Sequence, residues 1–248
     1  MIILRSDEEI AAIRKAGKIL AATIDKLKKY AKAGAATEEL DRIARDEILK
    51  RNGYPAFKDY KGFPGNICTS INEVVVHGIP SERKLKDGDI ISIDVGVKFR
   101  DFFADAAVTI GIGRISETAS ELIKVTKEAL YIGIENAHPG NRLSDVSCKI
   151  QEHVEANNFS VVRAFVGHGI GTKIHEEPEI PNYGKPGTGP RLERGMVLAI
   201  EPMVNAGTYE VEILEDGWTA VTKDRRLSAH FEHTIVIKDK GAEILTGD

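Results

Sequence analysis

The sequence contains one ten-residue pattern twice. Residues 85–94 and 192–201 both read Leu-x-x-Gly-x-aliphatic-aliphatic-x-Ile-acid, so that the two copies end at Asp94 and Glu201. In both copies an apolar run of the length of a β-strand leads directly into a carboxylate. A pattern that recurs 107 positions later in a chain of 248 residues predicts a fold built from two related halves.

A second acid on an apolar run follows each copy, Asp105 in the first half and Glu232 in the second. Burying a lone carboxylate costs several kcal/mol unless it is paired or binds a metal ion. Four such acids therefore predict a shared site for divalent cations, although any single one could be a solvated or salt-bridged residue. The duplication predicts that Asp94 is equivalent to Glu201 and Asp105 to Glu232, with one pair terminal and one bridging two ions.

Composition excludes several classes of protein. With 34 Lys and Arg against 38 Asp and Glu, the formal charge is −4, and no basic block is present to bind nucleic acid. The apolar start is too short for a signal peptide, and no apolar run is long enough to cross a membrane. Two cysteines, Cys68 and Cys148, are too few for a disulfide framework or a zinc module. We expect a cytoplasmic chain with reduced thiols.

The order of predicted elements also repeats. Ser6 to Glu9 form a capping-box pattern that opens a helix reaching towards Tyr30, and a second helix is predicted over 37–52 with Gly53 as its C′ residue. Short β segments at 67–70 and 74–77 precede the first repeat strand. In the second half the predicted elements are helices over about 116–136 and 143–158 and a strand near 161–162. We expect a single catalytic domain with halves of about 1–112 and 113–248.

The second half carries an insertion. Asp105 and Glu232 lie 127 positions apart, about 20 more than the two repeat acids. Residues 209–214 and 218–221 alternate in polarity around Asp216-Gly217, which is a strong signal for a two-residue hairpin turn. We expect a hairpin that forms a lip over the cation site and carries Trp218.

Histidines distinguish the halves. His168 and His175 lie in a glycine-rich stretch in which the backbone can approach closely, and His168 is the better ligand candidate, although a turn with two polar residues would look the same. Shifting His168 back by 107 positions gives Lys61, so only one metal ion would gain a nitrogen ligand. His77 follows an apolar run, where a structural role is more common. Histidines interpreted as structural are His138, His153, His230 and His233. The last two flank Glu232 and could instead support a metal ligand from behind.

The residues around His168 and His175 resemble the signature of a known family. The stretch that carries the resemblance runs Phe165-x-Gly167-His168-Gly169-Ile170-Gly171-x-x-x-His175-x-x-x-x-Ile180-x-Asn182-Tyr183, which is similar to the signature of type I methionine aminopeptidases. The acids and His168 also follow the order of that family's five ligands, and the resemblance covers essentially the whole chain. It implies the α/β (α+β) pita-bread fold, with two α-α-β halves around a central antiparallel sheet. The implied activity is removal of the initiator methionine from nascent proteins whose second residue is small.

The resemblance implies a role for each ligand. Asp94 would bind the first metal ion, His168 and Glu201 the second, and Asp105 and Glu232 would bridge them. The two divalent ions would be Co, Mn, Fe or Zn. A water bridging them would attack the carbonyl of the first residue, and Glu201 would shuttle the proton to the leaving amine.

The resemblance also implies the substrate contacts. His77 and His175 match histidines that contact the substrate peptide group and stabilise the tetrahedral intermediate. A side-chain pocket for methionine would be formed by Tyr60, Phe63, Cys68 and Trp218, whose alternative interpretation is ordinary core packing. Where relatives often carry an aromatic residue before the second histidine, this chain has Ile174, which affects the shape of the pocket floor.

Other functions fit the sequence less well. X-Pro aminopeptidases and prolidases share the fold and ligands but usually carry an additional N-terminal domain, and only about 60 residues precede the β region here. The spacing from Glu201 to Glu232 is too short for the helical insertion of type II methionine aminopeptidases. A binding module of this fold typically loses ligands, and a metal store would not need His77, His175 or Trp218. The expected partners are N-terminal peptides of nascent chains and a ribosome contacted through the folded surface, and we expect a monomer.

Overall fold

The computed structural model describes residues 2–247. The helices are α1 (Asp7–Tyr30), α2 (Thr37–Lys50), α3 (Glu117–Glu135), α4 (Leu143–Ala156) and the short 3₁₀ turn η1 (Tyr60–Gly62). The strands of the first half are β1 (Tyr54–Pro55), β2 (Cys68–Ile71), β3 (Val74–Val76), β4 (Ile90–Phe99) and β5 (Phe102–Gly111). Those of the second half are β6 (Ser160–Val161), β7 (Gly167–Gly169), β8 (Glu176–Ile180), β9 (Val197–Ile200), β10 (Met203–Asn205), β11 (Val211–Ile213), β12 (Ala220–Thr222), β13 (Ser228–His230), β14 (His233–Lys238) and β15 (Gly241–Ile244). The predicted order of helices and strands is therefore confirmed.

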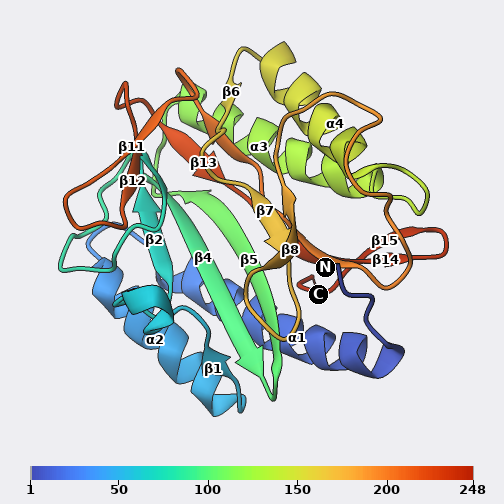
Figure 1. The fold of residues 1–248 in the computed structure, drawn as a ribbon. Coiled ribbons are helices and arrows are strands. Elements are labelled where there is room, and N and C mark those ends of the chain that lie inside the picture. Colours follow the sequence, from blue (N-terminus) through green and yellow to red (C-terminus); the bar gives the residue numbers. More distant parts are fainter. Residues whose placement is uncertain (1, 248) are drawn as a thin grey trace.

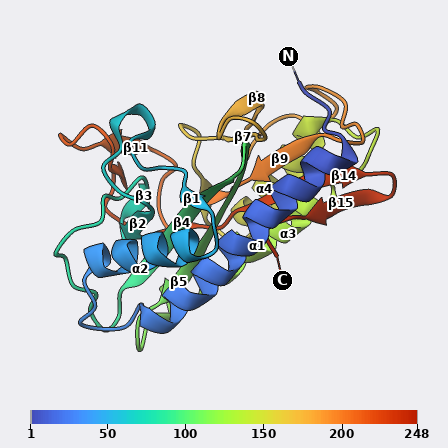
Figure 2. The ribbon, with the colours of Figure 1, turned by 90° about the horizontal axis from the view of Figure 1, so that it is seen from below.

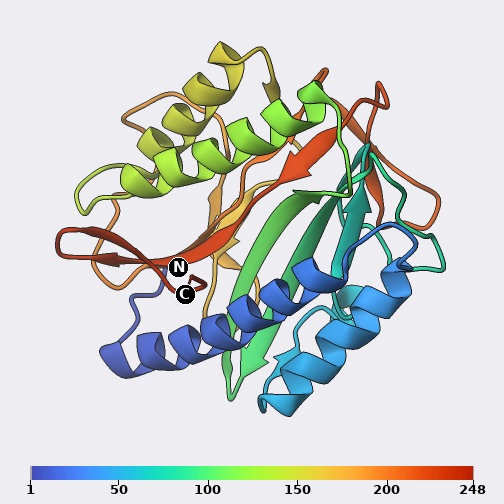
Figure 3. The same ribbon diagram turned by 180° about the vertical axis from the view of Figure 1, so that it is seen from behind.

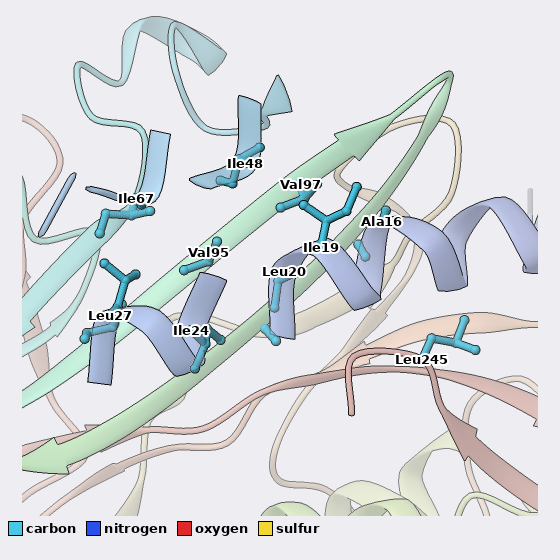
Figure 4. Packing of buried hydrophobic residues seen from close by; sticks show 14 of the residues in the cluster. Ala16, Ile19, Leu20, Ile24, Leu27, Ile48, Ile67, Val95, Val97 and Leu245 are labelled. Atoms are coloured by element: carbon cyan, nitrogen blue, oxygen red, sulfur yellow. The ribbon is translucent and has the colours of Figure 1, made fainter. Parts of the chain in front are cut away.

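The first helix begins as its sequence predicts. The Ser6 hydroxyl accepts a hydrogen bond from the Glu9 amide at 3.3 Å, and the Glu9 carboxylate accepts one from the Ser6 amide at 2.8 Å. One face of α1 is apolar and packs on β4 and β5, where Leu20 and Leu27 are fully buried (Figure 4). Burying each of these leucines contributes about 1.5–3 kcal/mol to folding.

The second helix ends earlier than predicted. It stops at Lys50, and Asn52, with φ 61°, adopts the left-handed conformation that was assigned to Gly53. Asparagine tolerates this conformation better than most residues, so no glycine is needed there. Gly53 instead provides space, because a Cβ atom at 53 would lie 3.1 Å from a Val97 methyl group and 3.2 Å from one of Ile48.

The helices cover one face of the strands. In the view from behind, α1 crosses in front of the strands with α2 beside it, and α3 lies in front of the second half with α4 beside it (Figure 3). Seen from below, β7, β8 and β11 lie on the side away from these helices (Figure 2). Each helix pair has its own apolar core against its own strands. The face opposite the helices is where the site residues gather. Among the described residues, no helix is both long and apolar enough to span a membrane.

The strands form four antiparallel groups (Figure 1). Their orders are β1-β4-β2 with β5 paired to β4, then β13-β10-β6, β11-β12-β3 and β15-β14-β9-β7-β8. The two halves join where Ala107 of β5 and Glu232 exchange backbone hydrogen bonds, at 2.9 Å for the Glu232 amide and 3.4 Å for the Ala107 amide. Asp94 and Asp105 lie inside β4 and β5. Glu201 and Glu232 lie just outside β9 and β14, a departure from the predicted continuous strand, because Pro202 has no amide hydrogen to continue a ladder.

The register corrects one predicted equivalence. In the first half Asp94 pairs with Ala107, and in the second half the pair Ile200 and His233 places Glu201 opposite Glu232 one step further on. The two predicted equivalences therefore cannot both hold. If Asp94 is aligned with Glu201 through the repeat, the position that corresponds to Glu232 is Ala107, two residues away from Asp105. Sequence repeats identify matching strands, but in a strand a shift of two residues keeps a side chain on the same face and leaves no trace in the polarity pattern.

The inserted hairpin is present with a wider turn than predicted. β11 and β12 pair from Val211 with Thr222 to Ile213 with Ala220, so the connection is longer than two residues. The Asp216 carboxylate accepts hydrogen bonds from the amides of Trp218 and Thr219, both at 2.8 Å, and this local turn replaces the last rungs of the ladder. β12 also pairs with β3, which brings the hairpin to the strand that precedes His77.

Candidate active site

The residues proposed for catalysis, metal binding and substrate binding meet in one cavity of about 210 Å³. It is lined by Phe57, Tyr60, Lys61, Phe63, Cys68, His77, Asp94, Asp105, His168, His175, Glu201, Trp218 and Glu232. Of these, only Phe57 and Lys61 were not predicted from the sequence. Strands and loops from both halves of the chain contribute to the cavity, so its composition depends on the assembled fold.

One end of the cavity is a cluster of acids around a histidine. Ligand atoms of Asp105, His168 and Glu232 lie within 4.8 Å of one another, and these three residues are buried. Asp94, Asp105 and Glu232 each have a buried carboxylate oxygen with no hydrogen-bond partner among the described residues. Buried oxygens without partners are unusual in native proteins, and a cation between them would satisfy all three.

Burial disfavours the ionised form of these acids. It raises the pKa of Asp94 to about 6, with the neighbouring Glu201 adding to the shift and His230 opposing it. For Asp105, burial and then the Asp94 carboxylate raise the pKa well above its usual value. The pKa values of Glu201 and Glu232 are likewise raised well above the usual range by burial. Four acids that resist ionisation together need positive charge at their centre to become anionic at neutral pH.

His168 is oriented as a ligand. Its Nδ1 lies 3.0 Å from the Gly169 carbonyl oxygen, which fixes the proton on Nδ1 and leaves the Nε2 lone pair facing the acids. Nε2 lies 3.4 Å from Oε1 of Glu201. Burial lowers the pKa of His168 to about 4, so the ring is neutral at pH 7. A neutral imidazole held by a backbone carbonyl on its far nitrogen is the arrangement found in metal-binding histidines.

Three glycines around His168 provide space. A Cβ atom on Gly167 would overlap the Ala199 carbonyl, and one on Gly169 would overlap the Glu177 carbonyl. A Cβ atom on Gly171 would overlap the guanidinium of Arg5. None of the three has a positive φ. The glycine-rich stretch therefore exists because β7 is packed tightly between its neighbours, as its sequence suggested.

Two further imidazoles lie between the acids and the rest of the cavity. The His175 ring lies 4.3 Å from the His168 ring between centroids, and its Nδ1 is 2.9 Å from the Tyr60 hydroxyl. Burial lowers the pKa of His175 to about 3 and that of His77 to about 4. His77 has φ 60°, a strained conformation for a non-glycine residue and one that concentrates at functional sites. Both rings are neutral hydrogen-bonding groups at pH 7.

Of the two histidines that flank Glu232, one belongs to the site. His230, interpreted from sequence as structural, is buried with its Nε2 3.6 Å from Oε2 of Glu201. Its spacing of two residues from Glu232 was the available signal, because residues i and i+2 of a strand share a face. His233 points to the other face, where its Nδ1 lies 2.8 Å from the Thr246 hydroxyl.

The other end of the cavity is apolar. Phe63 and Trp218 meet edge to face with ring centroids 5.2 Å apart, and Cys68 is buried beside them. Burial raises the pKa of the Cys68 thiol well above its usual value, so it remains a neutral, polarizable group. Ile174 is 2% exposed and packs in the same cluster, but it does not line the cavity. This end suits an unbranched apolar side chain.

The residues present fit a divalent cation. Oxygen ligands dominate, one neutral imidazole is added, and three buried oxygens lack other partners. Such a centre, placed beside two neutral imidazoles and an apolar pocket, is suited to hydrolysing an amide whose adjacent side chain occupies the pocket.

Comparison with known proteins also supports a metal-dependent peptidase. The sequence matches metallopeptidase family M24 over residues 11–239. It is 56% identical over 246 residues to a methionine aminopeptidase of Clostridium perfringens and 54% identical to methionine aminopeptidase 1 of Bacillus subtilis, with 99% of each chain covered in both cases. The structure superposes on the crystal structure of methionine aminopeptidase from Thermotoga maritima with a TM-score of 0.99, 47% identity and complete coverage of both chains. A prolidase from Pyrococcus furiosus shares the fold, with a TM-score of 0.80 at 23% identity over 99% of this chain and 66% of that one.

Proposed function

The chain belongs to metallopeptidase family M24, and we propose that the cavity described above is the active site with which it removes the initiator methionine from nascent proteins. It is a metal-dependent aminopeptidase with the pita-bread fold that the sequence resemblance implied. One observation carries the assignment of the site: a single cavity joins a cation-binding cluster of acids to an apolar pocket closed by Phe63 and Trp218.

We propose two divalent cations, chosen from Co, Mn, Fe and Zn by availability. Asp94 would hold one, His168 and Glu201 the other, and Asp105 and Glu232 would lie between them. The support is the position of Glu201, whose Oε1 lies 3.4 Å from Nε2 of His168 and whose Oε2 lies 3.6 Å from Nε2 of His230, together with the buried oxygen of Asp94 that has no partner among the described residues. When bound, such cations acidify a water and polarise the carbonyl of the scissile bond.

Side chains of the protein itself would stabilise the oxyanion and transfer the proton. The Tyr60 hydroxyl can donate to Nδ1 of His175, which leaves the proton on Nε2 free to donate to the oxyanion. His77, held between the rings of Phe165 and Trp218, can donate to the peptide group from the other side. A carboxylate oxygen of Glu201 would take the proton that the water loses and pass it to the leaving amine.

We propose that residues 1–248 form one catalytic domain whose halves, about 1–112 and 113–248, each contribute ligands. The backbone hydrogen bonds between Ala107 and Glu232 support this, since they couple the halves at the site itself. We propose a preference for substrates with a small second residue, as the sequence resemblance implies. We further propose that the enzyme acts as a monomer in the cytoplasm, where ribosomes release its substrates.

A direct assay tests this proposal. Protein stripped of metal and reloaded with Co(II) or Mn(II) should release methionine from Met-Ala-Ser and Met-Gly-Ser, should act much more slowly on Met-Leu-Ser, and should leave an Ala-Pro-Ser peptide intact. Metal analysis of the same preparation gives the number of ions per chain at full activity. Cleavage of the X-Pro bond without release of methionine would contradict the assignment, and full activity with one ion per chain would contradict the pair of metals.

A further inference from the structure

The loop that carries His175 is held by a residue from the far end of the chain. Residues 170–175, here called the His175 loop, connect β7 to β8, and the register of those strands is irregular at the base of the loop. Arg5 precedes α1, and its side chain is only 4% exposed. Its guanidinium forms an ion pair with Glu176, the first residue of β8, and lies against the backbone of Gly171. Arg5 therefore contacts both ends of the His175 loop.

Glu176 connects Arg5 to residues inside the His175 loop. The oxygen Oε2 is occupied by Arg5, and Oε1 accepts hydrogen bonds from the Lys173 amide at 2.9 Å and the Thr172 hydroxyl at 3.1 Å. The carboxylate is thus the common partner of the Arg5 side chain and of two loop residues that precede His175. A charged group with this little exposure is costly without its counter-ion.

The backbone of Arg5 is itself fixed. Its amide donates to the Gly195 carbonyl at 2.8 Å, next to β9, and its Nη1 lies 3.3 Å from the Glu9 carboxylate in the first turn of α1. The rigid elements behind Arg5 are therefore α1 and the strand that leads to Glu201. Other contacts of the His175 loop include a hydrogen bond from the Phe103 amide to the Gly171 carbonyl at 2.8 Å, the hydrogen bond of His175 to Tyr60 and the packing of Ile174.

We propose that Arg5, acting through Glu176, is a positioning residue that holds His175 at the distance from His168 needed for catalysis. This rests on the proposed function, because it assigns a task to His175 in methionine release. Catalysis is sensitive to such positioning, since a displacement of about 1 Å can cost about 100-fold in rate. The same contact explains Gly171, where any side chain would take the space of the guanidinium.

The test is a double-mutant cycle. Arg5→Met keeps the apolar stem and removes the charge, and it should lower kcat for a Met-Ala-Ser peptide about 10- to 100-fold with bound metal unchanged. In a His175→Ala background the same substitution should cause less than about a twofold further loss, because the group it positions is gone. Arg5→Lys should recover part of the activity. Long-range ¹H–¹⁵N spectra of the histidine rings should show His175 perturbed in Arg5→Met.

Controls separate positioning from folding. Arg14→Met breaks a more exposed ion pair, between α1 and Glu243 of β15, and should leave kcat unchanged. If Arg5→Met does not fold, Glu176→Gln, which keeps the shape of the side chain, carries the same cycle. Equal losses with and without His175, or no loss at all, would overturn the inference. A wild-type protein that releases no methionine would instead refute the proposed function, whatever the state of Arg5.

Discussion

Thr109 and Thr234 each hold the backbone of the other half of the molecule. The Thr109 hydroxyl donates to the His230 carbonyl at 2.8 Å and accepts from the His230 amide at 2.9 Å. The Thr234 hydroxyl makes the same pair of bonds to Asp105, at 2.8 and 2.9 Å. Both hydroxyls are buried. This reciprocal clamp fixes the two halves against each other beside two groups of the candidate centre.

Thr234→Val should therefore weaken both the fold and metal binding. Valine has the shape of threonine but leaves the backbone amide and carbonyl of Asp105 without their partner, which costs roughly 2 kcal/mol or more of unfolding free energy. Because Asp105 is a proposed metal ligand, we also expect metal affinity to fall by about 10-fold or more. Denaturant unfolding and metal titration measure the two effects.

The matched control is Thr69→Val. Thr69 is 4% exposed, and its hydroxyl has no partner among the described residues, so valine removes a buried polar atom without breaking a bond. This variant should be as stable as the wild type or more stable. Equal destabilisation by the two substitutions would mean that the hydroxyl of Thr234 is not what holds Asp105.

Substitutions in the site should separate ligands from substrate contacts. Asp105→Asn and Glu201→Gln should each lower kcat by about 100-fold or more. Asp105→Asn removes a proposed bridging ligand, and Glu201→Gln removes both a charged ligand and the proton carrier. His175→Ala should lower kcat but leave metal content nearly intact. Metal analysis beside steady-state kinetics distinguishes them, and loss of metal in His175→Ala would show that the ligand set is wrong.

The sequence was sufficient for features with local or periodic signals. The capping box at Ser6, the amphipathic stripe of α1 and the paired repeat strands depend on neighbours in the chain, and each appears in the structure. The glycines beside His168 were also interpreted correctly as points of close approach. In these cases a few adjacent residues determine the outcome.

Features that depend on tertiary packing were not predictable in the same way. Arg5 is ordinary in sequence, and its role at the His175 loop comes from a contact across 171 positions. Which side His230 and His233 face depends on the register after the break at Pro202. The turn at Asp216 widened because a side chain competed with the ladder for backbone amides.

Metal binding should depend on pH through the acids. In the metal-free protein burial raises the pKa of Asp94 to about 6 and those of Asp105 and Glu232 well above their usual values, so these groups hold protons that a cation must displace. His168, with its pKa lowered to about 4, does not compete above pH 5. Metal affinity should therefore rise with pH through and beyond pH 6. Calorimetry in two buffers of different ionisation enthalpy should detect protons released on binding.

The stability of the metal-free protein has two opposing pH terms. Asp94 binds more protons folded than unfolded between its ordinary value of 3.8 and about 6, so its contribution to stability falls as pH rises through that window. His175 and His77, with lowered pKa values, bind fewer protons folded, so their contribution rises up to pH 6.5. Bound metal removes the proton uptake of the acids, so the unfolding free energy of metal-loaded protein should gain on that of metal-free protein as pH rises through about 6. Denaturant unfolding of both forms over a range of pH measures this effect. A difference in unfolding free energy between them that does not change with pH would contradict this assignment of the acids.

Trp218 should contribute to recognition of the methionine side chain. Its ring closes the apolar end of the cavity against Phe63, at 5.2 Å, and faces His77, at 6.1 Å. Trp218→Leu should lower kcat/KM for a Met-Ala-Ser peptide about 10-fold, the scale of one lost aromatic contact, with metal content unchanged. Since sulfur gains from contact with aromatic rings, the substitution should also narrow the preference for methionine over norleucine, its sulfur-free analogue. Ile213→Ser, on the same hairpin but 59% exposed, is the matched control and should change neither value. Equal losses in both variants would mean that the hairpin acts through its overall fold, and an unchanged ratio of methionine to norleucine would place the Trp218 ring outside the pocket.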